Sequence, residues 1–146
     1  MKIKQIHLSR KLQNDLSLLS KSRYPEESCA ILFGKIENEI IPISRVTKIL
    51  ELQNITHSQV EFQWDDIEFY NQIVTHQKQG LQLVGIFHSH PHDPNFSDYD
   101  RAVIQNTGKL YPELIWVIYG NTTDTFNAVI LSQMHHIKKI PIISSE

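Results

Sequence analysis

The stretch from residue 85 to residue 100 reads Gly-Ile-Phe-His-Ser-His-Pro-His-Asp-Pro-Asn-Phe-Ser-Asp-Tyr-Asp. Its first residues complete the apolar run from Leu81 to Phe87, which is short and bounded and therefore predicts a buried central strand. Pro91 has no backbone N–H and ends that strand. Ser97-x-x-Asp100 has the spacing of a helix N-cap followed by an acid in the first turn. The stretch thus predicts a strand, a reverse loop and a helix that meet at one place.

Metal-ligating residue types gather at that meeting point. Alternate residues of a strand point to the same side, so His88 and His90 face one point while Ser89 faces away. Asp100, at the start of the next helix, lies within reach of the same point. A catalytic zinc ion takes three protein ligands, keeps a fourth position for water and lowers the pKa of that water. We therefore expect His88, His90 and Asp100 to bind one zinc ion.

Several neighbouring residues leave alternatives open. His92, Asp93 and Asp98 are near enough to compete as ligands, although exposure or a supporting contact is the simpler expectation for each of them. A hydrolytic site also needs a proton acceptor, and both Glu26 and Glu27 precede a predicted buried strand; spacing alone does not choose between them. Each motif by itself has an ordinary explanation, such as a capping box or a solvated loop charge. The conjunction of motifs favours a metal site.

Hydrophobic periodicity predicts the remaining elements. Helices are expected over residues 9–19 with Ser9 as N-cap and from Ser97 onward. A further helix is expected from Asp65 to Gly80, with Ile67, Tyr70 and Val74 on one face and Phe69 and Ile73 beside it. Strands are expected around residues 3–6 and over 29–33, 40–49, 81–87, 114–119, 125–131 and 137–143, with a turn at 37–39, a strand end at Gly34 and a short strand at 60–62. These elements predict a three-layer α/β domain in which helices flank a central, mostly antiparallel sheet.

Composition limits the classes of protein to consider. The 146 residues contain no repeat or linker, so we expect a single domain over 1–146. Cys29 is the one cysteine of the sequence and cannot form an internal disulfide, which favours a reducing, cytoplasmic location. The opening residues contain no apolar stretch of the length of a signal peptide, so none is expected, and no apolar run approaches the roughly 20 residues of a membrane span. A net charge of −2 argues against a nucleic-acid or membrane surface as partner.

Two segments together resemble a known family. His88-Ser-His90-Pro91 and Ser97-x-x-Asp100, with six residues between His90 and Ser97, are together similar to the JAMM motif of the JAB1/MPN/Mov34 metalloproteases. The segment 25–34, Pro-Glu-Glu-Ser-Cys-Ala-Ile-Leu-Phe-Gly, resembles the Pro-x-Glu-x-Cys-Gly segment upstream of that motif. Many members have seven residues between the second histidine and the serine, whereas this chain has six, as short prokaryotic-type members do. Ala30 stands where the family commonly has a glycine. The resemblance covers nearly the whole chain and implies the MPN, cytidine-deaminase-like fold.

Carried over by position, the resemblance implies a role for each site residue. His88, His90 and Asp100 would bind zinc, and Glu27 would be the general base and later the proton donor. Ser97 would stabilise the oxyanion, while Ser89 would support the loop.

The implied activity is that of a zinc-dependent isopeptidase or peptidase. It would cleave after the C-terminal tail of a ubiquitin-like protein, with residues 52–63 as one wall of the groove. The alternative is processing of a ubiquitin-like sulfur-carrier protein by release of C-terminal residues such as cysteine. A non-catalytic MPN scaffold is less favoured because the ligands and the acid are present. A homo-oligomer is compatible with the sequence.

Overall fold

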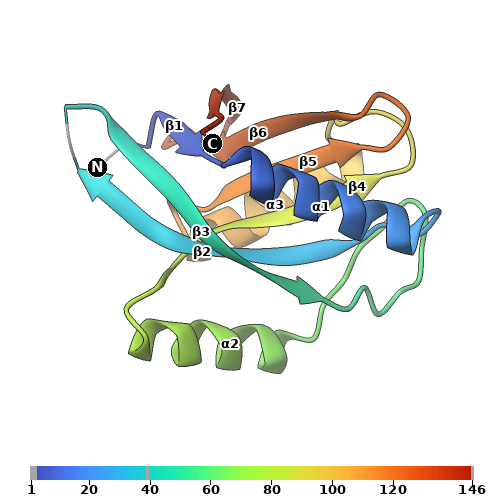
Figure 1. Ribbon diagram of the computed structural model, residues 1–146, viewed down its shortest axis with the longest axis horizontal. Coiled ribbons are helices and arrows are strands. Elements are labelled where there is room, and N and C mark those ends of the chain that lie inside the picture. The colour runs from blue at the N-terminus through green and yellow to red at the C-terminus, as the bar shows by residue number, and fades with distance from the viewer. Residues whose placement is uncertain (1–2, 39, 146) are drawn as a thin grey trace.

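The computed structural model describes residues 3–38 and 40–145; Met1, Lys2, Glu39 of the predicted turn and Glu146 lie outside the described residues. The chain forms one sheet in the order β7-β6-β5-β4-β2-β3-β1-β8 (Figure 1). The strands are β1 Gln5–His7, β2 Cys29–Asn38, β3 Pro42–Leu52, β4 Gln82–His90, β5 Ile115–Gly120, β6 Thr125–Leu131, β7 Ile137–Ile140 and β8 Ile142–Ile143. The helices are α1 Arg10–Arg23, α2 Asp66–Lys78 and α3 Asp98–Leu110.

The sheet is mixed, with more antiparallel than parallel pairings. β2 pairs antiparallel with β3 and β4, and β6 with β5 and β7, whereas β4–β5, β1–β3 and β1–β8 are parallel. The prediction of one closing strand over 137–143 is wrong, because this segment forms two strands, β7 and β8. Pro141 separates β7 from β8, which lie at opposite edges of the sheet, so the sheet must curl until its edges approach each other. The Pro141 carbonyl accepts a hydrogen bond of 3.1 Å from Ile6, which marks where the chain changes edges.

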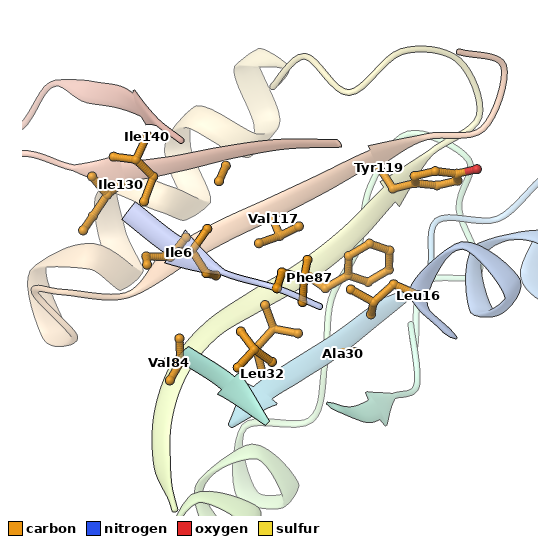
Figure 2. Close-up of a cluster of buried hydrophobic side chains, with 14 of the residues drawn as sticks. Ile6, Leu16, Ala30, Leu32, Val84, Phe87, Val117, Tyr119, Ile130 and Ile140 are labelled. Atoms are coloured by element: carbon orange, nitrogen blue, oxygen red, sulfur yellow. The ribbon is translucent and has the colours of Figure 1, made fainter. Parts of the chain in front are cut away.

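Helices cover the two faces of the curled sheet, as the three-layer prediction requires. On one face, Leu16 of α1 packs with Leu32 and Phe87 in a buried cluster (Figure 2). On the other face, α2 and α3 contribute Phe69 and Ile104 to a second cluster. The predicted N-cap of the first helix is confirmed, since the Ser9 side chain accepts a hydrogen bond from the Leu12 N–H. Within the described residues, no helix combines the length and the apolar character needed to cross a membrane.

Helix α2 buries a different face from the predicted one. Ile67 and Tyr70 are 74% and 61% exposed, whereas Phe69, Ile73 and His76 are buried. Two apolar stripes run along this helix, and the stripe that packs against the sheet is the one that ends in His76. The His76 ring stacks on Phe33 of β2 with ring centroids 3.9 Å apart, so the aromatic contact compensates for the polar residue.

Two further differences concern the hairpin and the segment that follows it. Strand β2 does not end at Gly34 but continues to Asn38, with a register shift between Phe33 and Gly34. A Cβ at Gly34 would overlap the Arg45 carbonyl across the ladder, so this glycine permits close strand approach and does not end the strand. The short strand expected at 60–62 is wrong: residues 53–65 form an irregular loop between β3 and α2.

Candidate metal centre

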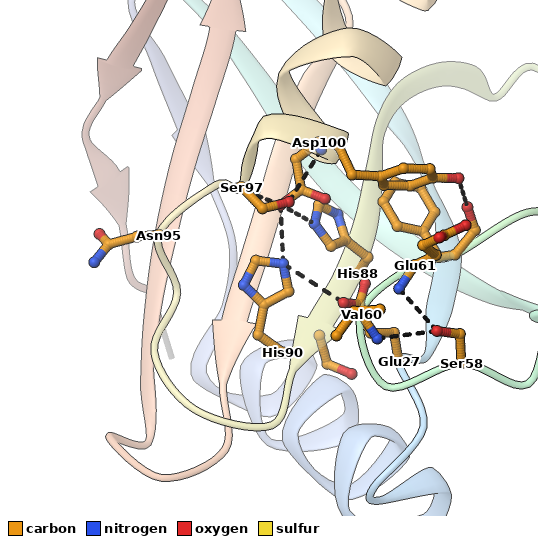
Figure 3. Close-up of polar contacts among 12 residues, drawn as sticks. Glu27, Ser58, Val60, Glu61, His88, His90, Asn95, Ser97 and Asp100 are labelled. Carbon is orange, nitrogen blue, oxygen red and sulfur yellow. Dashed lines mark hydrogen bonds and ion pairs between the residues drawn. The ribbon is translucent and has the colours of Figure 1, made fainter.

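The end of β4 and the start of α3 bring three ligand-type side chains together. His88 is fully buried and His90 is 9% exposed, and both point toward Asp100 in the first turn of α3 (Figure 3). The Nε2 atoms of His88 and His90 lie 3.2 and 2.9 Å from the same carboxylate oxygen, Asp100 Oδ2. The residues predicted as metal ligands therefore converge on one point.

The N-terminus of α3 fixes Asp100 by a capping box. The Asp100 N–H donates to Ser97 Oγ at 3.1 Å, and the Ser97 N–H donates to Asp100 Oδ2 at 3.0 Å. The predicted N-cap is thus confirmed, and the acid performs two tasks because its carboxylate also faces the histidines. Ser97 is exposed, and its hydroxyl oxygen accepts in the cap, so its hydroxyl hydrogen is free to point at a bound molecule.

The register of β2 against β4 brings Glu27 to the same point. Cys29 lies opposite His88 in this antiparallel pair, and the Ser89 N–H donates to the Ser28 carbonyl at 3.0 Å. One further residue along each chain places Glu27 beside His90, with Glu27 Oε2 4.0 Å from His90 Nε2. A ligand-type atom from each of Glu27, His88, His90 and Asp100 lies within 4.8 Å of the others. The strand pairing therefore places Glu27, and not Glu26, at the cluster.

Glu26 and the other competing residues lie outside this cluster. The Glu26 carboxylate is 39% exposed and lies 3.5 Å from His57 Nδ1. His92, Asp93 and Asp98 are exposed, as the simpler expectation for them states. Asp93 also supports the site through its backbone, because its carbonyl lies 3.2 Å from His90 Nδ1.

Contacts behind the histidines orient their rings. A hydrogen bond from His90 Nδ1 to the Asp93 carbonyl leaves Nε2 of that ring free to act as a ligand. His88 has its ring stacked on Phe62, with centroids 4.2 Å apart and an interplanar angle of 20°. Ser89 faces the opposite way, and its Oγ accepts a hydrogen bond of 2.9 Å from the Ser28 N–H. Ser89 thus holds the start of β2 against β4, and its expected support of the loop stays a prediction.

Burial and neighbouring charges shift the pKa values of the two carboxyl groups in opposite directions. Burial raises the pKa of Glu27 to about 8, although nearby His90 opposes the shift. Burial acts in the same direction on Asp100, but the two histidines and the Ser97 N–H outweigh it and hold the pKa of Asp100 well below its usual range. Burial lowers the pKa of His88. For His90, burial lowers the pKa but the Asp100 and Glu27 carboxylates outweigh it, so the pKa of His90 is raised. His88 is therefore neutral and Asp100 ionised, as metal ligands require, and His90 would give up a proton when a metal binds.

The unpaired polar atoms of the cluster fit a metal ion. Buried polar groups are normally hydrogen-bonded, yet His88 Nε2, Asp100 Oδ1 and Glu27 Oε1 have no hydrogen-bond partner in the described part of the chain. Two imidazole nitrogens and one carboxylate form a typical donor set for catalytic zinc. Glu27 lies slightly farther away, where a carboxylate can exchange a proton with a molecule held at the centre. His88, His90 and Asp100 could thus hold zinc, with Glu27 beside it.

Sequence reasoning missed two residues that support this centre. Phe62 stacks on His88, and Asn54 hydrogen-bonds the backbone of Glu27 at 2.8 Å. Both belong to the irregular loop that follows β3, where no periodicity distinguishes one residue from the next. The signal in the sequence is the apolar pair Val60 and Phe62 in an otherwise polar segment, and the same pair is also typical of a short strand.

Comparisons with known proteins show the family and the fold. Residues 9–132 match the family described as prokaryotic homologues of the JAB domain. The chain is 34% identical over 120 residues to a desampylase of Pyrococcus furiosus, covering 80% of this chain and 75% of that protein. A protein of Desulfitobacterium hafniense with a known solution structure has a similar fold, with a TM-score of 0.75 and 21% identity over 97% of this chain and 93% of the other.

Proposed function

The chain belongs to the family of prokaryotic JAB-domain homologues, and from this premise we propose that it is a zinc-dependent peptidase or isopeptidase. Its substrate would be the C-terminal tail of a ubiquitin-like protein. The observation that carries the proposal is the buried Glu27 carboxylate beside the His88, His90 and Asp100 donor set. The Pyrococcus relative supports the substrate class, because a desampylase takes its name from the removal of a ubiquitin-like modifier.

The chain's own residues can divide the chemical work. A bound zinc ion would supply polarisation of the scissile carbonyl and a lowered pKa for water. Glu27 takes the proton of the attacking water and later delivers it to the leaving amine, because its carboxylate is buried and has a raised pKa. Ser97 donates its free hydroxyl hydrogen to the developing oxyanion. His90, oriented by the Asp93 carbonyl, keeps its Nε2 directed at the centre.

The loop of residues 53–63, here called the site loop, forms one wall of the proposed substrate groove. It contacts the site through Phe62, and its apolar side chains Ile55 and Val60 are 47% and 68% exposed. An extended tail can bind along such a wall by backbone hydrogen bonds and side-chain contacts. Shortening the loop over residues 55–60 should raise KM for a ubiquitin-like fusion; an unchanged KM would contradict this placement.

One set of assays tests the proposal. Zinc-loaded protein is incubated with ubiquitin-like fusions that carry different residues after Gly-Gly, with an isopeptide-linked conjugate, and with a sulfur carrier that ends in an extra cysteine. We expect one bound zinc per chain and cleavage directly after the tail. Cleavage should fall by roughly 10²–10⁴-fold in Glu27→Gln and stay near wild type in the matched variant Glu26→Gln.

The pattern of products distinguishes the alternatives. Preference for the conjugate supports isopeptidase activity, and preference for the carrier supports processing. Substoichiometric zinc together with no hydrolysis of any substrate would contradict the proposal in favour of a scaffold. Cleavage that persists in Glu27→Gln would reject Glu27 as the base.

A further inference from the structure

The Asn54 side chain is a buried hydrogen-bonding hub next to the proposed base. The residue is 7% exposed. Its Nδ2 donates to the Glu27 carbonyl at 2.8 Å and to the Glu61 carbonyl at 3.0 Å. Its Oδ1 accepts from the N–H groups of Thr56 and Gln63 at 3.2 and 3.1 Å, and from the Thr56 hydroxyl at 2.8 Å. Carbonyls only accept and N–H groups only donate, so these partners fix the orientation of the amide.

The Glu27 backbone depends on the site loop for both of its hydrogen bonds. Strand β2 begins at Cys29, so Glu27 precedes the regular ladder. Its N–H donates to the Ser58 carbonyl at 2.8 Å, and its carbonyl accepts from Asn54 Nδ2. The carboxylate itself has few anchors, since Oε1 has no hydrogen-bond partner among residues 3–38 and 40–145. The position of this carboxylate is therefore set largely through its backbone.

We propose that Asn54 is a positioning residue that couples the site loop to the segment bearing Glu27. Through Asn54 the loop holds the base in place, so a substrate that orders the loop also orders the base. This inference rests on the proposed function, because it assumes that Glu27 acts as the base. It implies that contacts between the tail and the loop contribute to kcat as well as to KM, since binding away from the scissile bond then improves alignment at it.

The opposite end of the loop is anchored independently. The Tyr99 hydroxyl donates to the Phe62 carbonyl at 2.6 Å, and the Phe62 ring stacks on His88. Residue 99 is next to Asp100 in α3. The loop is thus fastened to the ligand-bearing elements at one end and to the base-bearing segment at the other, and Asn54 makes the second attachment. Loss of Asn54 should free the base while leaving the metal ligands in place.

Asn54→Asp is the sharpest test. The substitution keeps the shape and the acceptor oxygen but replaces both N–H donors with an oxygen that faces two carbonyls. Gln13→Glu is the matched control: it makes the same amide-to-carboxylate change in the first turn of α1, where the amide donates to the Leu8 carbonyl and the Ser144 hydroxyl, each at 2.8 Å. Gln13→Glu loses the bond to the Leu8 carbonyl, while the Ser144 hydroxyl can turn and donate to the new carboxylate. The control thus makes the same chemical change away from Glu27, and only Asn54→Asp alters a contact with Glu27.

Two measurements are compared. In zinc-free protein, hydrogen exchange of the Glu27, Ile55 and Gln63 amides should accelerate about tenfold or more in Asn54→Asp, because their bonding depends on the hub. In zinc-loaded protein at equal zinc content, kcat for a ubiquitin-like fusion should fall by about tenfold to a hundredfold in Asn54→Asp. Neither quantity should change in Gln13→Glu.

The outcomes separate the coupling from the proposed function. Faster exchange in the loop without faster exchange at Glu27 would overturn the coupling. Faster exchange at Glu27 with unchanged kcat would overturn the positioning role. If wild-type protein cleaves no tail substrate, the proposed function fails, and the exchange result then decides by itself whether Asn54 joins the loop to Glu27.

Discussion

Replacing Glu27 with glutamine should lower catalysis strongly and yet stabilise the zinc-free protein at alkaline pH. Burial favours the protonated form of Glu27 and raises its pKa from 4.5 to about 8. In the unfolded chain the Glu27 carboxyl ionises near its ordinary pKa, whereas in the folded chain it ionises only at the raised pKa. The stabilising contribution of the protonated form is therefore fully present below about pH 4.5 and is lost as the pH rises to about 8.

The size of this effect follows from the difference between the two pKa values. Each pKa unit corresponds to about 1.4 kcal/mol, so the free energy of unfolding of the zinc-free wild type should fall by roughly 3–5 kcal/mol across this interval through Glu27 alone. Glutamine does not titrate, so Glu27→Gln lacks this loss. The stability of the variant relative to wild type should thus increase steadily between pH 5 and pH 8.

Urea denaturation in the presence of a chelator measures this difference. Wild type, Glu27→Gln and Glu26→Gln are unfolded at intervals from pH 5 to pH 9, and differences between proteins remove the titration that all of them share. Glu26 is half-exposed, so its variant should stay within about 0.5 kcal/mol of wild type at each pH. Saturating zinc should flatten the dependence, because a nearby cation favours the ionised carboxylate. A difference between Glu27→Gln and wild type that stays constant with pH would refute the reasoning, since Glu27 would then be ionised in the folded protein.

Three further outcomes are expected. Ser97→Ala should lower kcat by about 10²–10³-fold and lower the free energy of unfolding by about 1 kcal/mol through the lost cap. Ser97→Gly should lower kcat as much but lower the free energy of unfolding by only about 0.3 kcal/mol. A near-normal kcat in both variants would exclude an oxyanion role for Ser97. Gly120→Ala should weaken zinc binding by about 10–100-fold in chelator competition, because its Cβ would lie 2.6 Å from Asp93 Cα and displace the carbonyl that orients His90; unchanged affinity would show that the loop adapts. Burial raises the pKa of Cys29 to about 12, so a thiol reagent at pH 8 should react only after unfolding, and rapid reaction of the folded protein would contradict that burial.

The sequence was sufficient to predict residues whose roles depend on short-range geometry. His88 and His90 share a side because alternation along a strand is local, and Asp100 follows from the spacing of a capping box. The long-range register of β2 against β4 was not available from spacing, so the residues alone left Glu26 and Glu27 as alternatives until the family resemblance selected Glu27. In the structure, the pairing of Cys29 with His88 brings Glu27 to His90.

The errors have the same physical origin. The buried face of α2 depends on which apolar stripe meets the sheet, and in the structure Phe69, Ile73 and His76 face it, with His76 stacked on Phe33. Pro141 ends one strand and starts another at the far edge of a sheet whose curl no local pattern reveals. Asn54 has a role only because an irregular loop folds back onto Glu27. In each case a tertiary contact selects among options that are locally equivalent.

The two carboxylates of the site show why one can serve as a ligand and the other as a proton carrier. Asp100 accepts the Ser97 N–H and faces two imidazoles, so its charge is compensated from several directions and a proton adds little. Glu27 is also buried, and among the described residues His90, 4.0 Å away, is the group whose charge opposes its protonation, so burial dominates and favours the protonated form. Environments that push two pKa values apart in this way assign separate acid–base roles. The helix start that compensates Asp100 and the loop that encloses Glu27 therefore matter as much to the proposed reaction as the ligand atoms themselves.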